Sequence, residues 1–150
     1  MQNNELLSSI CNALNLSEGD LNALLALYND KAILQTESEP QASLLEECSN
    51  EQLRCILEGL ILAERGPRSD GSRPDMNSEA LTNNDVLKKL RIALNLEQEN
   101  MLLIFEEGGA TLTDSELGAL FRKQGNKHFR ACSDELLLQF LDGFQSSLDT

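Results

Sequence analysis

Residues 83–96 read NNDVLKKLRIALNL, and residues 3–16 read NNELLSSICNALNL. A second pair of matched stretches follows in the same order, CSNEQLRCILEGL at residues 48–60 and CSDELLLQFLDGF at residues 132–144. Two matched blocks in one order indicate an internal duplication, which decides how the rest of the chain is read. The sequence therefore predicts two homologous units in tandem.

The apolar residues of the first block recur at helical spacing in both copies. In one copy they are Val86, Leu87, Leu90, Ala93 and Leu94, and in the other they are Leu6, Leu7, Ile10, Ala13 and Leu14. We expect each helix to begin at the Asn pair, whose side-chain oxygen can accept a hydrogen bond from a first-turn amide. We expect each to end near the Asn-Leu pair, because Asn tolerates the left-handed backbone of a helix end.

Further amphipathic stretches predict the remaining helices. Three of them follow a serine that suits an N-cap: Ser17, Ser49 and Ser133. Residues 113–116 have the spacing of a capping box and open a short helix through Phe121. Residues 101–105 repeat the apolar stripe that follows Ser17, and residues 40–45 predict a shorter helix in the first copy.

A stretch without a repeating apolar face separates the two copies. Residues 65–82 hold two of the three prolines and are predicted to be a flexible linker that spans about 20–25 Å. The chain then divides into a first helical unit at residues 1–64, the linker, and a second helical unit at residues 83–150. Units of this length bury only about 60% of their unfolded surface, so each needs apolar cover from the other or from a second chain. The predicted fold is all-α, with three or four helices in each unit and pseudo-two-fold symmetry.

The composition argues against several classes of function. The net charge of −13, from 12 basic and 25 acidic residues, disfavours nonspecific binding of the whole molecule to nucleic acid or anionic lipid. The apolar stretches are too short to cross a bilayer. The N-terminus has no basic region before an apolar run, which argues against a secretory signal. The four cysteines contain no CxxC pair and are predicted to be reduced thiols. We therefore expect a cytoplasmic protein without a membrane partner.

Several stretches resemble the YehS family of bacterial proteins. They are the Asn-Asn opening with Ala-Leu-Asn-Leu, the Leu-Asp-Gly-Phe close at residues 141–144, LFRK at residues 120–123 and FRACSD at residues 129–134. The resemblance covers nearly the whole chain and is strongest between residues 83 and 144. It implies a tandem pair of helical units in a cytoplasmic protein, and it brings no established chemistry, because the family carries a label of unknown function. Residues 44–48, LLEEC, replace the basic stretch of the family in the first unit. A site that depends on that stretch can therefore exist only in the second unit.

No set of residues predicts catalysis. His128 is the single histidine and has no evident Ser or Asp partner for a triad. His128 and Cys132 offer two metal ligands without a second pair, so the favoured interpretation is a surface histidine beside a buried cysteine. Cys48 and Cys132 each precede a serine cap, where a helix N-terminus can activate a thiol, but packing is the favoured role. We predict no enzymatic activity, no cofactor and no metal.

The glycines of the predicted final helices occupy matched positions. Gly59 and Gly143 lie inside these helices, where glycine costs about 1 kcal/mol relative to alanine. Their presence in both copies predicts that another backbone passes close to each, in a contact between helices, and the alternative is the approach of a ligand. The Gly108-Gly109 pair lacks the strand, lysine and hydroxyl of a phosphate-binding loop and predicts a helix C-cap instead.

The basic residues of the second unit form two groups. Residues 1–82 carry 14 acidic and 5 basic residues, which gives −9, whereas residues 83–150 carry 11 and 7, which gives −4. If the groups converge, they form a cationic face for phosphates or for an acidic protein. The alternative is a solvated face that balances nearby acids, with Phe129 in the core. The candidate partner-binding residues are Lys88, Arg91, Arg122, Lys123, Lys127, His128 and Arg130.

These observations lead to a functional hypothesis with alternatives. The leading hypothesis is a noncatalytic cytoplasmic module that binds an unidentified protein partner through its helical surfaces. The alternative is a nucleic-acid-associated adaptor that uses the basic face of the second unit. A homo-oligomer, in which apolar surface is buried against a second chain, also remains open.

Overall fold

The computed structural model describes residues 1–28, 43–75 and 77–148, and this part of the chain is helical without strands. The helices are α1 (Asn3–Leu14), α2 (Glu18–Ala26), α4 (Asn50–Arg65), α5 (Asn83–Ala93), α6 (Gln98–Glu107), α7 (Asp114–Leu120) and α8 (Asp134–Leu148). The all-α prediction is therefore confirmed for the described residues. None of these helices combines the length and the hydrophobicity that crossing a membrane requires.

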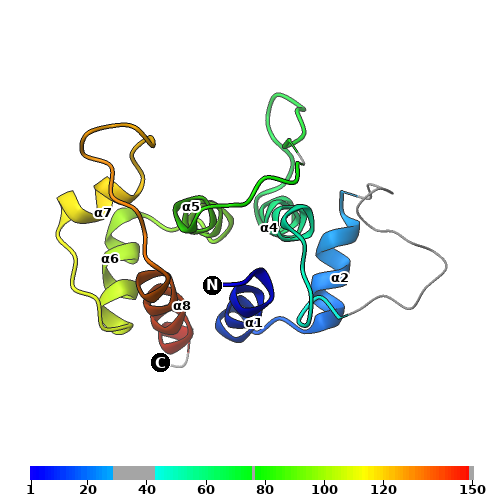
Figure 1. Cartoon of the computed structure of the whole chain (residues 1–150), viewed down its shortest axis with the longest axis horizontal. Coiled ribbons are helices and arrows are strands. Elements are labelled where there is room, and N and C mark those ends of the chain that lie inside the picture. Colours follow the sequence, from blue (N-terminus) through cyan, green and yellow to red (C-terminus); the bar gives the residue numbers. More distant parts are fainter. Residues whose placement is uncertain (29–42, 76, 149–150) are drawn as a thin grey trace.

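Four helices form the centre of the molecule. Figure 1 looks along α1, α4, α5 and α8, with α2 outside this group on one side and α6 and α7 on the other. Helix α4 packs against α2 and α5, while α8 packs against α6 and α1. The N-terminal and C-terminal parts of the chain therefore pack against each other through the pairs α1–α8 and α4–α5.

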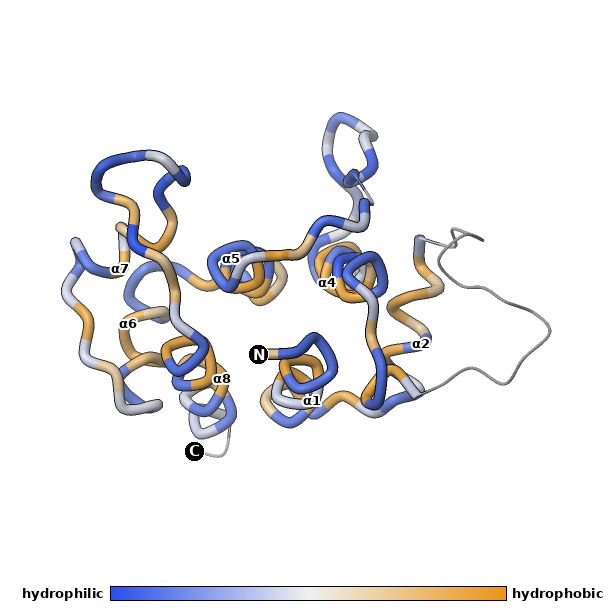
Figure 2. The backbone as a smooth tube through the Cα atoms, in the orientation of Figure 1, coloured by the Kyte–Doolittle hydropathy of each residue, from blue (hydrophilic) through white to orange (hydrophobic). Residues whose placement is uncertain are grey.

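A single hydrophobic core unites these helices. All seven contribute fully buried side chains, for example Leu7, Leu21, Leu57, Leu87, Phe105, Leu117 and Phe140. The rings of Phe105 and Phe140 lie 5.4 Å apart between α6 and α8, in a tilted arrangement that aromatic pairs favour. In Figure 2 the hydrophobic positions lie along the helices, whereas the loop between α7 and α8 is largely hydrophilic.

The predicted helix ends are correct in most places. Asn15 and Asn95 both adopt left-handed backbone, with φ of 57° and 54°. The serine caps are present as well: the side chains of Ser17, Ser49 and Ser133 each accept a hydrogen bond from a first-turn amide, at 3.1, 3.0 and 3.0 Å. The capping box at residues 113–116 opens α7. The predicted helix at residues 40–45 falls partly on residues 29–42, outside the described part of the chain.

The role predicted for the Asn pair as an N-cap is wrong. The N-caps of α1 and α5 are Gln2 and Thr82, one residue earlier. The Asn3 and Asn83 side chains instead donate to the backbone oxygens of Cys48 and Cys132, at 3.1 and 3.0 Å. Because Thr82 already accepts from the first-turn amide of Asp85, the side chain of Asn83 is available to tie α5 to the start of α8.

The prediction for the two helical glycines is confirmed. A Cβ atom on Gly59 would lie 2.4 Å from the carbonyl oxygen of Leu24, and one on Gly143 would lie 1.8 Å from that of Ile104. Both contacts are too short for any side chain. Glycine therefore permits the close crossings of α4 on α2 and of α8 on α6.

Residues 66–75 and 77–82 connect α4 to α5 and make several contacts with Tyr28 and with α4. The Arg73 guanidinium donates to the backbone oxygen of Tyr28 at 2.9 Å and lies 5.3 Å from the centre of its ring. Asn50 and Arg54 of α4 donate to the backbone oxygens of Ser78 and Glu79, at 3.1 and 3.3 Å. The path of this segment therefore follows α4 as far as the start of α5.

Candidate functional site

The loop between α7 and α8 carries most of the candidate residues. We call residues 121–131 the basic loop. It holds four basic side chains and one histidine, all of them exposed: Arg122, Lys123, Lys127, His128 and Arg130. Two successive turns within the loop and a hydrogen bond of 3.0 Å from the Arg130 amide to the Ala119 oxygen bring its ends together. Figure 1 shows the loop standing away from the helical centre.

One side chain on α5 holds both ends of the basic loop. The Asn84 amide nitrogen donates to the backbone oxygens of Leu120 and Arg130, at 2.9 and 2.8 Å. Its oxygen accepts from the backbone amide of Cys132 at 2.8 Å. Asn84 thus fixes the loop relative to α5, the helix that also carries Lys88.

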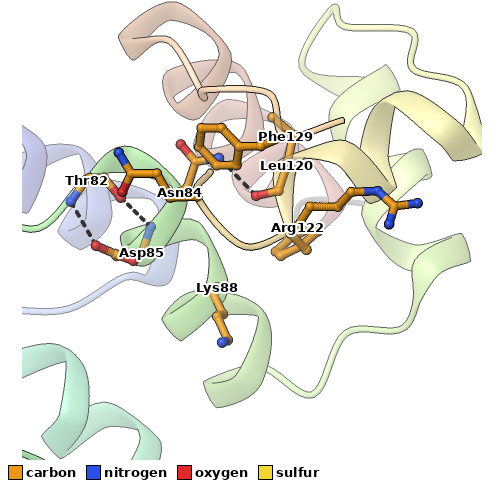
Figure 3. Close-up of a pocket in the computed structure, with 9 residues that line it drawn as sticks. Thr82, Asn84, Asp85, Lys88, Leu120, Arg122 and Phe129 are labelled. Atoms are coloured by element: carbon orange, nitrogen blue, oxygen red, sulfur yellow. Dashed lines mark hydrogen bonds between the residues drawn. The ribbon is translucent and has the colours of Figure 1, made fainter. Parts of the chain in front are cut away.

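A hollow between α5 and the basic loop brings two of the predicted cations together. We call it the α5 hollow. Lys88 of α5 and Arg122 of the loop line it together with Phe129, and its space amounts to about 420 Å³ when the open solvent at its mouth is included. Figure 3 shows Phe129 near Leu120 and Asn84. Lys88 extends from α5 and Arg122 from the basic loop, in different directions. Phe129 is half-buried and lines this hollow, although the sequence favoured a place in the core.

A second hollow, on the α7 side of the loop, has balanced charge. Arg122, His128 and Arg130 line it with Asp114 and Glu116. Arg130 forms an exposed ion pair with Glu116, at 3.4 Å. The pKa of the Glu116 carboxyl is lowered chiefly by the hydrogen bond from the Thr113 backbone amide, and only in smaller part by Arg130. The carboxylates of Asp114 and Glu116 therefore balance the positive charges on this side of the loop.

Arg91 has a structural role inside the molecule. Its Nε atom donates to the backbone oxygen of Leu96 at 3.1 Å, and its guanidinium lies 4.6 Å from the centre of the Phe121 ring. Such stacking of a cation on an aromatic face is favourable. Arg91 therefore links the end of α5 to the start of the basic loop, and these contacts engage its Nε atom and one face of its guanidinium.

The remaining cations have neither an ion pair, as Arg130 has, nor an aromatic contact, as Arg91 has. Within the described ranges, this group consists of Lys88, Arg122, Lys123 and Lys127 of the candidate set. Lys88 and Arg122 share the α5 hollow, whereas Lys123 and Lys127 lie on the basic loop without lining either hollow. One residue of each basic group, Lys88 and Arg122, therefore lines the same hollow, with the two side chains extending in different directions (Figure 3).

The cysteines do not offer an activated nucleophile. Burial raises the pKa of Cys132 to about 11 and that of Cys48 to about 12. Each thiol is therefore protonated near neutral pH, which weighs against the reactive role that a helix N-terminus could confer. Cys132 is buried and His128 is exposed, and the described part of the chain holds no group of three or more His, Cys, Asp or Glu arranged for a metal ion.

Comparison with known proteins gives one family and one relative. A family model described as "Protein of unknown function (DUF1456)" matches residues 83–148, which include α5 and the basic loop. The chain is 35% identical over 151 aligned residues to the "Uncharacterized protein YehS" of Escherichia coli (strain K12). This alignment covers 95% of the present chain and 94% of that protein. No solved structure matches.

Proposed function

Since the chain belongs to the YehS family, for which no activity is described, we propose from the geometry alone that it is a noncatalytic cytoplasmic module that binds an acidic segment of another protein. The basic loop and Lys88 form the contact surface. One observation carries the proposal: Lys88 and Arg122 line the same hollow beside the half-buried Phe129, and neither has an ion-pair partner among the described residues.

The chemistry of this surface suits a peptide with carboxylate and apolar side chains. Lys88 and Arg122 supply two separated positive charges, and Arg122 can bind a carboxylate through two parallel hydrogen bonds. The exposed part of Phe129 offers an apolar contact in the same hollow. Because Asn84 holds the loop on α5, the surface is preorganised, and binding orders fewer groups.

The charge of the whole molecule favours a protein over a nucleic acid. The Debye length is about 8 Å at physiological salt, so more distant charges are screened and a short acidic peptide experiences mainly the local cations. A nucleic acid requires a longer track of cations along its phosphates. Here Asp114 and Glu116 flank the basic loop and would repel such a backbone.

The second candidate is a nucleic-acid-associated adaptor. The observation that favours it is the pairing of Arg122 with the accessible Phe129, because cations and aromatic side chains together bind single-stranded nucleic acids by stacking. This candidate predicts an affinity for single strands that falls steeply with salt.

We also infer that the two halves are tandem copies with pseudo-two-fold symmetry, and several paired contacts support this inference. Exchanging α1 with α5 and α4 with α8 turns the α1–α8 contact into the α4–α5 contact. The bonds from Asn3 to Cys48 and from Asn83 to Cys132 form one such pair. The positions matched to Lys88 and Arg130 hold Ser8 and Glu46. The proposed surface therefore exists in the second copy alone.

The test compares one acidic ligand with one nucleic acid. A short fluorescein-labelled peptide of glutamate and phenylalanine is titrated with the full chain by fluorescence anisotropy, beside a single-stranded RNA of equal length. We expect the charge reversal Arg122→Glu to weaken peptide binding about tenfold, equivalent to about 1.4 kcal/mol. The control Arg65→Glu changes the net charge equally at an exposed site near the end of α4 and should leave binding unchanged. Equal loss in both variants would reduce the effect to net charge and contradict the proposal, while tighter binding of the RNA would favour the adaptor.

A further inference from the structure

A third hollow, separate from the basic loop, lies between α4 and α5 and is partly bordered by residues 77–81. We call it the α4–α5 cleft. It encloses about 1120 Å³ of space including its mouth, and its lining includes four basic and three acidic side chains, which gives a local charge of +1. This sign is opposite to that of the whole chain.

The acid at the floor of the cleft is already neutralised. Glu58 is 5% exposed, and its Oε1 atom lies 2.5 Å from Nζ of Lys89. Its Oε2 atom lies 3.9 Å from the Arg68 guanidinium. Glu58, Lys89 and Arg68 therefore satisfy one another's charges without a ligand.

Two cations of the cleft are not satisfied in this way. Arg54 donates from Nη2 to the backbone oxygen of Glu79, but its Nε atom is buried without a hydrogen-bond partner. The Arg54 guanidinium lines the cleft, and the backbone oxygen of Glu79 takes only one of its five N–H donors there. Lys88 has no ion pair in the described part of the chain. Asp85 is engaged as an acceptor from the Thr82 amide, at 3.1 Å.

The other end of the cleft is apolar. Asn50 meets Ser78 and Glu58 meets Lys89, so α4 and α5 run in the same general direction. Ile61 and Ile92 each lie one turn beyond this ion pair, and both line the cleft. Ile92 is 43% exposed, so it presents apolar surface at this end of the cleft.

We propose that the α4–α5 cleft binds a small amphipathic anion. Arg54 and Lys88 contact its carboxylate or phosphate group, and Ile61 and Ile92 contact its apolar body. The anion accepts hydrogen bonds from the part of the Arg54 guanidinium that lines the cleft, and the apolar body covers Ile92. A mixed lining of this kind, with a few placed polar groups beside apolar side chains, is typical of small-molecule sites.

The experiment uses the full chain and the fluorescent probe 8-anilinonaphthalene-1-sulfonate, an apolar anion. We expect saturable binding at one site. The variant Arg54→Gln should weaken it about tenfold, the effect of losing one charge-assisted hydrogen bond. Ile92→Glu, at a half-exposed position, should also weaken binding while leaving the melting temperature nearly unchanged. The matched control Arg122→Gln, which removes a charge outside the cleft, should have no effect.

Competition identifies which part of the ligand matters. 4-Phenylbutyrate should displace the probe, whereas inorganic phosphate and the neutral 4-phenylbutanol should not do so at the same concentration. Nonsaturable binding, equal effects of Arg54→Gln and Arg122→Gln, or equal displacement by phosphate would each overturn the proposal. Lys88 lines both sites, but Arg54 lies outside the α5 hollow and Arg122 lies outside the cleft, so these two variants distinguish the cleft from the acidic-peptide surface.

Discussion

The Nζ atom of Lys89 on α5 lies 2.5 Å from the Oε1 atom of Glu58 on α4, and the two side chains are 19% and 6% exposed. This ion pair joins the N-terminal and C-terminal parts of the chain in a largely dry environment. Removing one member of a buried pair leaves the other charge unpaired, which costs more than the pair itself contributes.

The first prediction concerns this pair. Glu58→Ala should lower the free energy of unfolding by about 3 kcal/mol, because the ammonium group of Lys89 then remains largely buried without the Glu58 carboxylate. The double variant Glu58→Leu with Lys89→Met should recover most of this loss. Urea denaturation measures both, and Glu64→Gln, an exposed change on the same helix, serves as the control with an effect below about 0.5 kcal/mol. A double variant as unstable as Glu58→Ala would show that the unpaired charge is not the cause.

The second prediction contrasts two helical glycines. Gly143→Ala should destabilise the protein by more than about 3 kcal/mol, because the new methyl group meets the backbone of Ile104 and α8 must move away from α6. Gly118→Ala on α7 meets no atom within 4 Å and should stabilise it by about 0.5–1 kcal/mol through helix propensity. Thermal unfolding followed by circular dichroism compares the two. Similar melting temperatures for both variants would contradict the close helix crossing.

The third prediction concerns the residue that holds the basic loop. Asn84→Asp keeps the size of the side chain but removes the donor to Leu120 and Arg130 and places a carboxylate beside their oxygens. We expect faster amide hydrogen exchange in residues 121–132 and weaker binding of the acidic peptide. Asn4→Ala, at the matched position of the first copy, is the control. If the exchange of the loop amides stays unchanged, Asn84 does not fix the loop.

Local signals in the sequence predicted much of the helical structure. The caps at Ser17, Ser49 and Ser133 and the left-handed ends at Asn15 and Asn95 depend on neighbours within one turn, so the sequence around them suffices. The close crossings at Gly59 and Gly143 were predictable for a different reason. A residue that is unfavourable in a helix appears at both matched positions of the sequence, and that cost indicates a contact.

The rest depended on partners that lie far away in the chain. The Asn pair is repeated, but only the structure shows that Asn83 and Asn84 bond to residues near the start of α8 and both ends of the basic loop. The Glu58–Lys89 pair could not be predicted, because nothing local indicates that α4 and α5 meet at these turns. For the same reason the sequence did not separate Arg91, which stacks on Phe121, from the unpaired Lys88 and Arg122.

The last prediction follows from the buried thiol of Cys132. Burial raises its pKa to about 11, whereas the unfolded thiol titrates near 9. Between these values the unfolded chain loses a proton that the folded chain keeps, so stability is fully present below pH 9 and falls as the pH rises toward 11. From pH 9 to pH 10.5 we expect a loss of about 1–2 kcal/mol from this group. The variant Cys132→Ala should lose less over the same interval in urea denaturation, since other alkaline groups titrate equally in both proteins. Parallel losses would show that the folded thiol titrates near its ordinary pKa.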